Sequence, residues 1–327
     1  MLRSKRMAII PVFLPWMGCS NRCIYCNEKA VTGNDHLNEH DLDIMKKLDK
    51  LMNDHLSFNK GDKKKQIAFF GGSFSNAPVP LQEKFLRWAN DYIHKGAVHS
   101  IRISTRPDGI TEREIELLKR YRCESVELGV QSFNDDVLIK NNRGHDVSTA
   151  VKAVKTLLSA NIETGVHLMT GMYGSNCELD DASFKKGLSL NPDTIRVHPT
   201  LVLKETALER LYLSGLYKPL DLREAVVQLG KYLLWTASTA VKLNRIGLFV
   251  PHELETSIIA GPYHPAIGDM AYTMAKVLEV KDKLKKCEQV IVDKKTYERF
   301  QAHKGFFDVY LKSEIESGRI KPINGGE

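Results

Sequence analysis

Short apolar runs alternate with longer amphipathic stretches along the chain. Six runs rich in β-branched and other apolar residues predict strands, and they span residues 8–13, 66–70, 100–104, 125–130, 163–169 and 194–197. Apolar residues recur at helical spacing between them, which predicts helices over residues 41–52, 80–93, 111–121, 146–160, 179–189 and 222–243. Asp41 and Asp146 are expected N-caps, and Thr111 with Glu114 is an expected capping box.

Strands that alternate with helices predict a parallel sheet with right-handed crossovers. Such a sheet is either open and doubly wound, or closed or partly closed as a barrel. In both arrangements ligands bind beyond the carboxyl ends of the strands. Turns rich in Gly, Ser, Thr and Pro follow most of the predicted strands. A common strand direction therefore places these turns on one rim of the sheet.

Composition narrows the class of protein. The chain has 327 residues and 43% hydrophobic residues, which suffices for one large α/β barrel or two ordinary domains. No apolar run reaches about 18 residues, so we expect no transmembrane helix and no membrane partner. The short apolar run at residues 7–16 holds two prolines and leads into three cysteines, so we interpret it as a strand entering a site and not as a signal peptide.

Charge and the scattered cysteines bear on partners and compartment. The formal net charge is +7, which permits an anionic partner such as nucleic acid, although basic clusters such as residues 281–286 also hold or border acids and fit solvated helix faces equally well. Cys123, Cys177 and Cys287 are scattered, which does not fit a disulfide framework and does fit a reducing cytoplasm. We expect Cys177 to be an unreactive loop thiol.

Three cysteines carry the strongest chemical signal. Cys19, Cys23 and Cys26 have C-x3-C-x2-C spacing, so one short loop can fold three thiolates around one centre. An iron–sulfur cubane usually takes four thiolates, so one iron would be left open for a substrate or cofactor. The alternative is a structural zinc site with His36 or His40 as fourth ligand. Closed zinc sites usually pair two cysteine knuckles, and the sequence has no second one.

This motif, with Tyr25 before the last cysteine, resembles the radical S-adenosylmethionine (SAM) superfamily. The resemblance implies that Cys19, Cys23 and Cys26 bind a [4Fe–4S] cluster whose open iron takes the amino and carboxylate groups of SAM. It further implies that one electron cleaves SAM and releases a 5′-deoxyadenosyl radical. An electron donor such as flavodoxin or ferredoxin is the partner this chemistry requires.

Two further turns, and Gln131 after the fourth predicted strand, resemble cofactor positions of the same superfamily. Residues 69–74 resemble a glycine motif whose backbone receives the SAM amino group, where a β-carbon would block the approach. Residues 103–108 resemble a motif that contacts the ribose and carboxylate of SAM. The resemblance implies cofactor contacts from Gly71, Gly72, Ser73, Ser104, Thr105, Arg106 and Gln131. The structural alternatives are ordinary turns and a pairing of Arg106 with Asp108.

A helix entry at residues 142–146 also recurs in relatives. Arg143 and His145 are candidate contacts for an anion at the positive end of that helix, and a purely structural role for His145 is the alternative.

A closer resemblance is carried by residues 11–33, 67–74, 101–110, 126–145, 167–174 and 192–211. It is to the class named for the Elongator catalytic subunit, MiaB and NifB, and within it to short Elongator-like proteins. It implies a partial (βα)6 TIM-type barrel of parallel strands, with a radical SAM core at residues 1–285 and a short C-terminal extension at 286–327. About 40 residues follow Lys286, too few for the acetyltransferase domain of the Elongator subunit. No second cysteine cluster of the methylthiotransferase kind is present in the sequence.

We therefore predict a cytoplasmic radical SAM enzyme whose substrate is a nucleotide in RNA. A small metabolite or a peptide is the alternative substrate. A non-catalytic iron–sulfur or zinc protein, acting as sensor or scaffold, is the alternative of another class.

Overall fold

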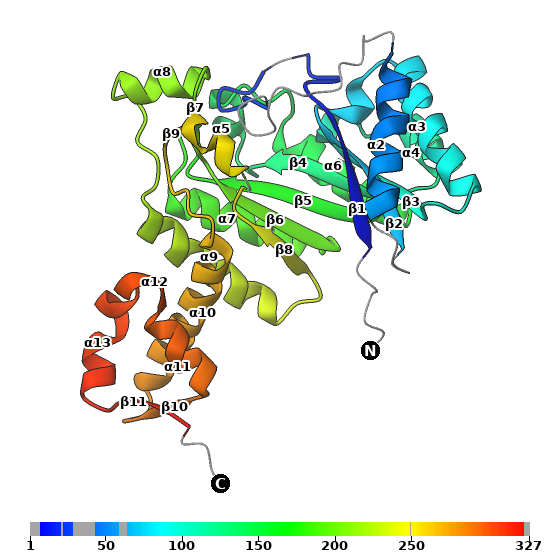
Figure 1. Ribbon diagram of the computed structural model, residues 1–327. Coiled ribbons are helices and arrows are strands. Elements are labelled where there is room, and N and C mark those ends of the chain that lie inside the picture. Colours follow the sequence, from blue (N-terminus) through cyan, green and yellow to red (C-terminus); the bar gives the residue numbers. More distant parts are fainter. Residues whose placement is uncertain (1–6, 21, 29–42, 59–63, 249, 324–327) are drawn as a thin grey trace.

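Seven parallel strands form one sheet that curls into a half-barrel in the computed structural model, which describes residues 7–20, 22–28, 43–58, 64–248 and 250–323 (Figure 1). The strand order is β1-β2-β3-β4-β5-β6-β8, and every neighbouring pair is parallel. The strands are β1 (Ala8–Leu14), β2 (Lys65–Gly71), β3 (Ser100–Thr105), β4 (Cys123–Gln131), β5 (Glu163–Thr170), β6 (Thr194–Pro199) and β8 (Lys242–Ile246). The predicted partial parallel barrel is confirmed.

A helix follows each of the first six strands. These helices are α2 (Ile44–Phe58), α3 (Val79–His94), α4 (Glu112–Arg120), α6 (Val147–Ser159), α7 (Cys177–Ser189) and α9 (Leu222–Ala237). Asp146 accepts a hydrogen bond from the Thr149 N–H and caps α6 as predicted. The predicted cap Asp41 lies outside the described residues. Thr111 accepts from the Glu114 N–H at 3.2 Å, which is one half of the predicted capping box.

One predicted helix is wrong in its last six residues. The helix expected over residues 222–243 ends at Ala237, and residues Lys242–Ile246 form the seventh strand, β8. The strand lies at the edge of the sheet and exposes Lys242, Asn244 and Arg245. Because an edge strand of this kind lacks an apolar alternation, its residues carry no strand signal.

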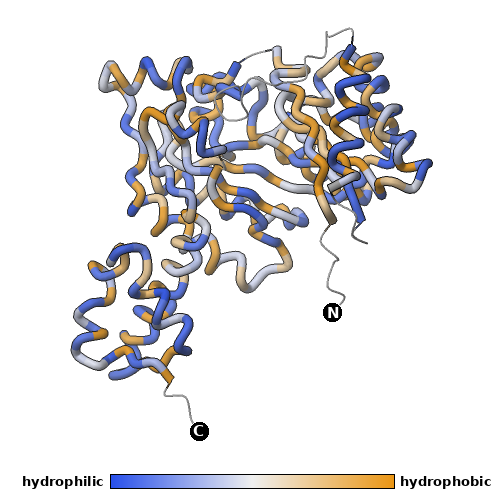
Figure 2. Tube along the Cα trace, viewed as in Figure 1, coloured by the Kyte–Doolittle hydropathy of each residue, from blue (hydrophilic) through white to orange (hydrophobic). Residues whose placement is uncertain are grey.

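The two faces of the sheet differ in polarity. One face carries fully buried apolar residues that pack against the helices, among them Phe69, Ile103, Leu128 and Val197. The other face lines the inside of the half-barrel and carries polar residues: Gln66, Arg102, Glu127, Glu163 and Arg196. Hydrophobic residues run along β1 and β2, whereas the helices beside them mix hydrophobic and hydrophilic positions (Figure 2). No helix within the described ranges is long and apolar enough to cross a membrane.

Two small additions complete the half-barrel. The strands β7 (Val202–Leu203) and β9 (Ile258–Ala260) pair antiparallel, and α8 (Ala207–Leu213) follows β7. Beyond α10 (Ile267–Leu284) the chain forms a compact C-terminal unit, seen at the lower left of Figure 1. It holds β10 (Val290–Val292), α11 (Lys294–Phe300), α12 (Ala302–Gly305), α13 (Asp308–Glu316) and β11 (Ile320–Pro322).

The C-terminal unit shares the hydrophobic core of the half-barrel. Phe300 and Phe307 are almost fully buried and belong to the same apolar cluster as the sheet. Arg319 Nη2 donates to the Leu284 carbonyl at 3.1 Å, and Arg299 pairs with Asp269 on α10 at 2.5 Å. The division at residues 285 and 286 remains a prediction.

Candidate active site

The cysteine loop begins where β1 ends, and its backbone lies against the loop that follows β2. The Ser73 N–H donates to the Met17 carbonyl at 2.6 Å, and the Gly72 N–H donates to the Leu14 carbonyl at 3.1 Å. A β-carbon at Gly72 would stand 2.1 Å from the Met17 oxygen, and one at Gly18 would stand 2.1 Å from the Ser73 oxygen. Glycine is therefore needed here because two backbones of this chain touch.

This contact gives the glycines after β2 a different role from the one inferred from the sequence. Gly71 has a φ of +116°, and a β-carbon there would meet the Leu14 carbonyl oxygen at 2.7 Å. The chain at the start of the cysteine loop occupies the space that a β-carbon of Gly71 or Gly72 would need. A contact of Gly71 or Gly72 with SAM through other backbone atoms remains a prediction.

The opposite side of the cysteine loop is held by segments far away in the sequence. The Ile24 N–H donates to the Asn141 carbonyl at 3.3 Å, and the Leu208 N–H donates to the Ile24 carbonyl at 2.8 Å. Asn142 Nδ2 donates to the Arg22 carbonyl at 2.8 Å. Asn141 and Asn142 follow the short helix α5 (Asp135–Lys140), so α5 and α8 flank the loop (Figure 1). The loop is fixed by backbone bonds on both sides.

Arg143 joins the cysteine loop to the sheet. Its Nη1 donates to Cys23 Sγ at 2.9 Å and to the Tyr25 hydroxyl at 3.4 Å. Its Nη2 donates to the Gly129 carbonyl on β4. The sequence singled out Arg143 as an anion contact, and the structure places it against a predicted cluster ligand. His145 instead has a ring nitrogen 3.2 Å from the Val130 carbonyl, which fits its structural interpretation.

Burial and neighbouring thiols disfavour free thiolates in this loop. Burial, followed by Glu28 and Cys23, raises the pKa of Cys19 to about 11. Burial, followed by Glu28 and the other two cysteines, raises the pKa of Cys26 as well. Arg143 offsets part of this rise in the pKa of Cys19 and Cys26, because a guanidinium stabilises a nearby thiolate. A bound cation would compensate the charge that three adjacent thiolates bring together.

The donor set of three thiols fits an iron–sulfur cubane with one open iron. In the described part of the chain, no three Cys, His, Asp or Glu side chains already stand in an arrangement that could hold a metal ion. The zinc alternative relied on His36 or His40, which lie outside the described residues. Three thiols alone leave one iron of a cubane without a protein ligand, as the sequence motif predicts.

Hydroxyl groups tie the loop after β2 to the loop after β3. Ser73 Oγ lies 3.1 Å from Thr105 Oγ1, which also lies 2.5 Å from Ser75 Oγ. The Arg106 N–H donates to Ser73 Oγ at 3.0 Å. Ser73 and Thr105 are almost fully buried, whereas Ser104 is partly exposed on the inner face. Ser73 and Thr105 thus fix the relative position of the two predicted cofactor loops, and their contact with SAM remains a prediction.

Arg106 is bound to Asp108, which confirms the structural alternative for this pair. Nε and Nη2 of Arg106 donate to the Asp108 carboxylate at 2.9 and 2.5 Å. The guanidinium bonds to Asp108 outweigh burial and lower the pKa of that carboxyl. Arg106 is 6% exposed, and its Nη1 has no hydrogen-bond partner among the described residues. A buried donor of this kind is a site where a ligand oxygen would be expected.

Gln131 has a strained backbone at the end of β4. Its φ is +69°, and the register of β4 with β5 shifts between Gly129 and Gln131. A non-glycine residue in this region costs on the order of 1 kcal/mol and is often retained at functional sites. Gln131 is 8% exposed, and its Oε1 lacks a partner in the described ranges. The hydroxyl of Thr170, at the end of β5, is also buried without a hydrogen-bond partner in those ranges. Thr170 was not among the site residues predicted from the sequence.

The remaining cysteines lie elsewhere. Cys123 is buried at the start of β4, the end of the strand away from the rim. Cys177 is exposed at the first position of α7, two residues before the predicted start of this helix, because Asn176 caps it. Cys287 is exposed beyond α10. The structure thus places the cysteine loop against the loop after β2, and it leaves the other three cysteines apart from that loop.

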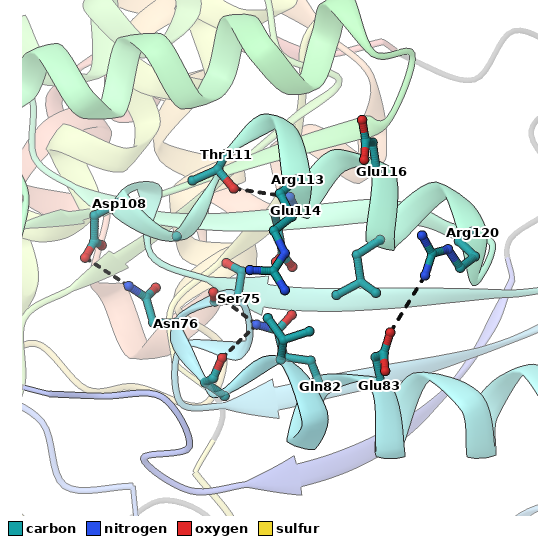
Figure 3. Close-up of a pocket in the computed structure, with 14 residues that line it drawn as sticks. Ser75, Asn76, Gln82, Glu83, Asp108, Thr111, Arg113, Glu114, Glu116 and Arg120 are labelled. Carbon is teal, nitrogen blue, oxygen red and sulfur yellow. Dashed lines mark hydrogen bonds and ion pairs between the residues drawn. The ribbon is translucent and has the colours of Figure 1, made fainter.

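A cavity of about 390 Å³ lies behind the two cofactor loops, between α3 and α4 (Figure 3). Gln82 Nε2 donates to the Ser75 and Ala77 carbonyls at 3.2 and 2.8 Å and so supports the loop after β2. Glu114 also lines this cavity and is 5% exposed. Burial raises the pKa of the Glu114 carboxyl to about 8. The carboxyl expected in the capping box is therefore buried at the wall of this cavity and is mostly neutral at pH 7.

Two known protein-family profiles match this chain. The sequence profile of the Radical SAM superfamily matches residues 14–182, and that of the Radical_SAM C-terminal domain matches residues 192–277. The chain belongs to the radical SAM superfamily. This radical SAM enzyme accordingly uses a [4Fe–4S] cluster and SAM as cofactors.

Two curated relatives of this radical SAM enzyme are longer than the chain. The tRNA uridine(34) acetyltransferase of Methanocaldococcus jannaschii is 28% identical over 245 residues, which cover 69% of this chain and 44% of the relative. The Elongator complex protein 3 of Mus musculus is 28% identical over 241 residues, which cover 66% and 43%. The chain thus spans less than half of the length of these curated relatives.

A solved structure shares the fold. Elp3 of Methanocaldococcus infernus, with residues 1–46 deleted, superimposes with a TM-score of 0.66 at 24% identity. The superposition covers 84% of this chain and 63% of that chain.

Proposed function

We propose that this enzyme generates a radical that reacts with a nucleotide in RNA. Cys19, Cys23 and Cys26 hold the cluster in this proposal, and SAM is held by Gly71, Gly72, Ser73, Ser104, Thr105, Arg106 and Gln131. The observation that carries the proposal is the cysteine loop fixed against the loop after β2 through Gly18 and Gly72, with Arg143 on Cys23. When bound, the reduced cluster supplies one electron that cleaves SAM and releases a 5′-deoxyadenosyl radical.

The chain's own residues position the reactants. The Ser73–Thr105 contact joins the two cofactor loops and the Arg106–Asp108 pair orders the second of them, so SAM would meet a preformed surface. The polar inner face of the half-barrel receives the substrate beside this surface. An enclosed site is needed because water and other solvent molecules would quench a radical. Reduced flavodoxin or ferredoxin would supply the electron.

Two observations support an RNA substrate. A relative named for its action on tRNA uridine is 28% identical over 69% of this chain. The net charge of +7 permits attraction to phosphates. The basic segment at the end of α10 is partly neutralised, because Lys283 pairs with Glu279 at 3.0 Å and Lys285 with Asp282 at 3.3 Å. A small metabolite or a peptide is the alternative substrate.

The cluster part of the proposal is tested with cysteine variants. Anaerobically purified protein is expected to be brown and to bleach on reduction. Cys23→Ala should lose most of its iron and all 5′-deoxyadenosine formation, because two thiolates hold a cubane poorly. Cys287→Ala, whose exposed thiol lies outside the motif, serves as the matched control. Full iron content in Cys23→Ala, or an equal loss in Cys287→Ala, would show that the ligand set is wrong.

The substrate part requires a separate measurement. Reduced enzyme and SAM are incubated with total RNA or with a small-metabolite extract, and 5′-deoxyadenosine is measured above the uncoupled background. We expect stimulation by RNA and retention of RNA at low salt. Stimulation by the metabolite fraction alone, without RNA retention, would replace RNA with the alternative substrate.

A further inference from the structure

A straight row of residues crosses four strands of the half-barrel on its inner face. Gly129 on β4 is in register with His167 on β5, His167 with Arg196 on β6, and Arg196 with Arg245 on β8. His198 lies on the same face, two residues beyond Arg196 toward the rim. The rings of His167 and His198 meet edge to face, with their centroids 4.3 Å apart. Two histidines and two arginines are thus neighbours in the half of the sheet away from the cofactor loops.

The acidic groups of this face are already bound. Arg196 donates to both oxygens of Glu127, from Nη1 at 3.0 Å and from Nη2 at 3.1 Å. Arg102 donates to the same carboxylate at 2.7 Å and to Glu163 at 3.3 Å. Gly165 lies on β5 between Glu127 and Arg196, and a β-carbon there would stand 3.4 Å from Glu127 Cγ. Glycine at this position lets the two side chains meet across the strand.

Positive charge remains after this pairing. The inner face carries three guanidiniums, of Arg102, Arg196 and Arg245, against the two carboxylates of Glu127 and Glu163. Within the described residues Arg245 forms no ion pair. After the larger effect of burial, Arg196 and Arg245 lower the pKa of both His167 and His198, and Arg143 also lowers that of His167. This corner of the barrel therefore favours a negative group.

Unused polar atoms lie at the same place. Nε2 of His167, Nε2 of His198 and Nε of Arg196 are buried and have no hydrogen-bond partner among the described residues. His198 is 8% exposed. Buried polar atoms are nearly always hydrogen-bonded, so three unpartnered ones in one place indicate a missing group with several acceptors. A β-carbon at Gly129 would stand 3.0 Å from Gln131 Nε2 and 3.5 Å from Arg143 Nη2, so glycine there lets these two polar side chains reach the end of the row.

We propose that His167, His198, Arg196 and Arg245 form a receptor for an oxyanion group of the substrate, a carboxylate or a phosphate. Guanidiniums and imidazole N–H groups donate to both kinds of oxyanion, and charge-assisted bonds of this type are short and strong. The receptor would hold the substrate by its charged end and leave another part of it beside the cofactor. The inference rests on the proposed function, in which the substrate enters the half-barrel.

The experiment observes the histidine rings directly. The full chain is labelled with ¹⁵N-histidine, and inorganic phosphate and acetate are added separately at constant ionic strength. The signals are assigned with His167→Gln and His198→Gln. We expect both rings to shift saturably with one of the two oxyanions, and chloride to leave them unchanged. Phosphate or acetate, whichever binds, identifies the oxyanion class.

Arginine variants test the charge. Arg245→Gln should weaken the binding about tenfold, the effect of removing one charge-assisted bond. Arg245 is exposed on an edge strand, so its loss should not unfold the protein. Arg120→Gln, which removes a 64% exposed guanidinium on α4, should leave the affinity unchanged. The absence of saturable shifts, or equal affinity in Arg245→Gln and the unmodified protein, would overturn the receptor.

SAM cleavage in the absence of substrate separates this inference from the proposed function. Cleavage by the reconstituted enzyme without oxyanion binding would refute the receptor and leave the radical chemistry standing. Oxyanion binding to a protein that cleaves no SAM would support the receptor and refute the proposed function.

Discussion

Gly72 and Met17 are in direct backbone contact, although 55 positions separate them: a β-carbon at Gly72 would stand 2.1 Å from the Met17 carbonyl oxygen and 2.3 Å from its nitrogen. Met17 lies two residues before the first cysteine of the motif. The loop after β2 therefore fixes one side of the cysteine loop. A change in one loop should be measurable in the other.

Gly72→Ala and Gly18→Ala should both reduce cluster content. The added methyl group would meet backbone atoms, which yield less easily than the end of a flexible side chain, so the cysteine loop would be displaced. Iron per protein after anaerobic reconstitution measures the effect. Gly268→Ala on α10 is the control, because its nearest contact would be 3.8 Å. Full iron content with weaker SAM binding in Gly72→Ala would favour the role inferred from the sequence.

Arg106→Ala should weaken SAM binding about 10- to 100-fold, which corresponds to the loss of a charge-assisted bond of about 1.5–3 kcal/mol. The cluster absorbance should not change, because Arg106 has no hydrogen bond to the cysteine loop among the described contacts. Calorimetric titration of the reconstituted protein with SAM measures the affinity. Asp108→Asn, which keeps the guanidinium and removes its neutralising charge, should bind SAM at least as well as the unmodified protein. Unchanged affinity in Arg106→Ala would mean that this residue is purely structural.

Glu114 should make the protein less stable as the pH rises. Its carboxyl has a pKa of about 8 in the folded state, whereas the ordinary pKa of an exposed glutamate is 4.5, so the folded state retains a proton that the unfolded state loses. The free energy of unfolding should fall between about pH 4.5 and about pH 8, by at most about 1.4 kcal/mol per pH unit from this group.

Glu114→Gln removes this titration. The variant should match the unmodified protein near pH 5 and exceed it at pH 8, as measured by urea unfolding at each pH. Glu116→Gln on the exposed face of the same helix is the control. Parallel pH profiles for Glu114→Gln and the unmodified protein would contradict a neutral buried carboxyl.

RNA binding, in the proposed function, should be weak and should fall steeply as the salt concentration rises. Lys283, Lys285 and Lys286 are exposed, and changing all three to Glu should reduce the retention of RNA. Filter binding at two salt concentrations measures this. The ion pairs of these lysines with Glu279 and Asp282 reduce the expected effect. Equal retention by the triple variant would direct the search for the RNA contact to the rim of the barrel.

Much of the fold could be predicted because its signals are local. The strand at residues 125–130 and its neighbours are apolar and bounded by turn residues, and their alternation with helices implies a parallel sheet. The strand β8 was not predicted, because it exposes Lys242, Asn244 and Arg245 and follows a long helix after only four residues. Whether a strand lies at the edge of a sheet depends on the tertiary structure, and the residues of the strand do not encode it.

The candidate site was predicted in part for the same reason. The spacing of Cys19, Cys23 and Cys26 lies within one loop and needs no tertiary information. The contact of Arg143 with Cys23 joins residues 120 positions apart, and the contact of Gly72 with Met17 joins two different loops. A glycine pattern shows that something approaches closely; only the folded chain shows that the approaching group is its own backbone.

The attachment of the cysteine loop has a consequence for the maturation of the enzyme. Its backbone partners come from the loop after β2, from Asn141 and from Leu208, so they converge only after most of the barrel has formed. We expect the cluster to bind after the half-barrel has folded, unlike zinc in small metal-dependent domains, where the metal nucleates the fold. We therefore expect delivery of iron and sulfide to act on the folded polypeptide.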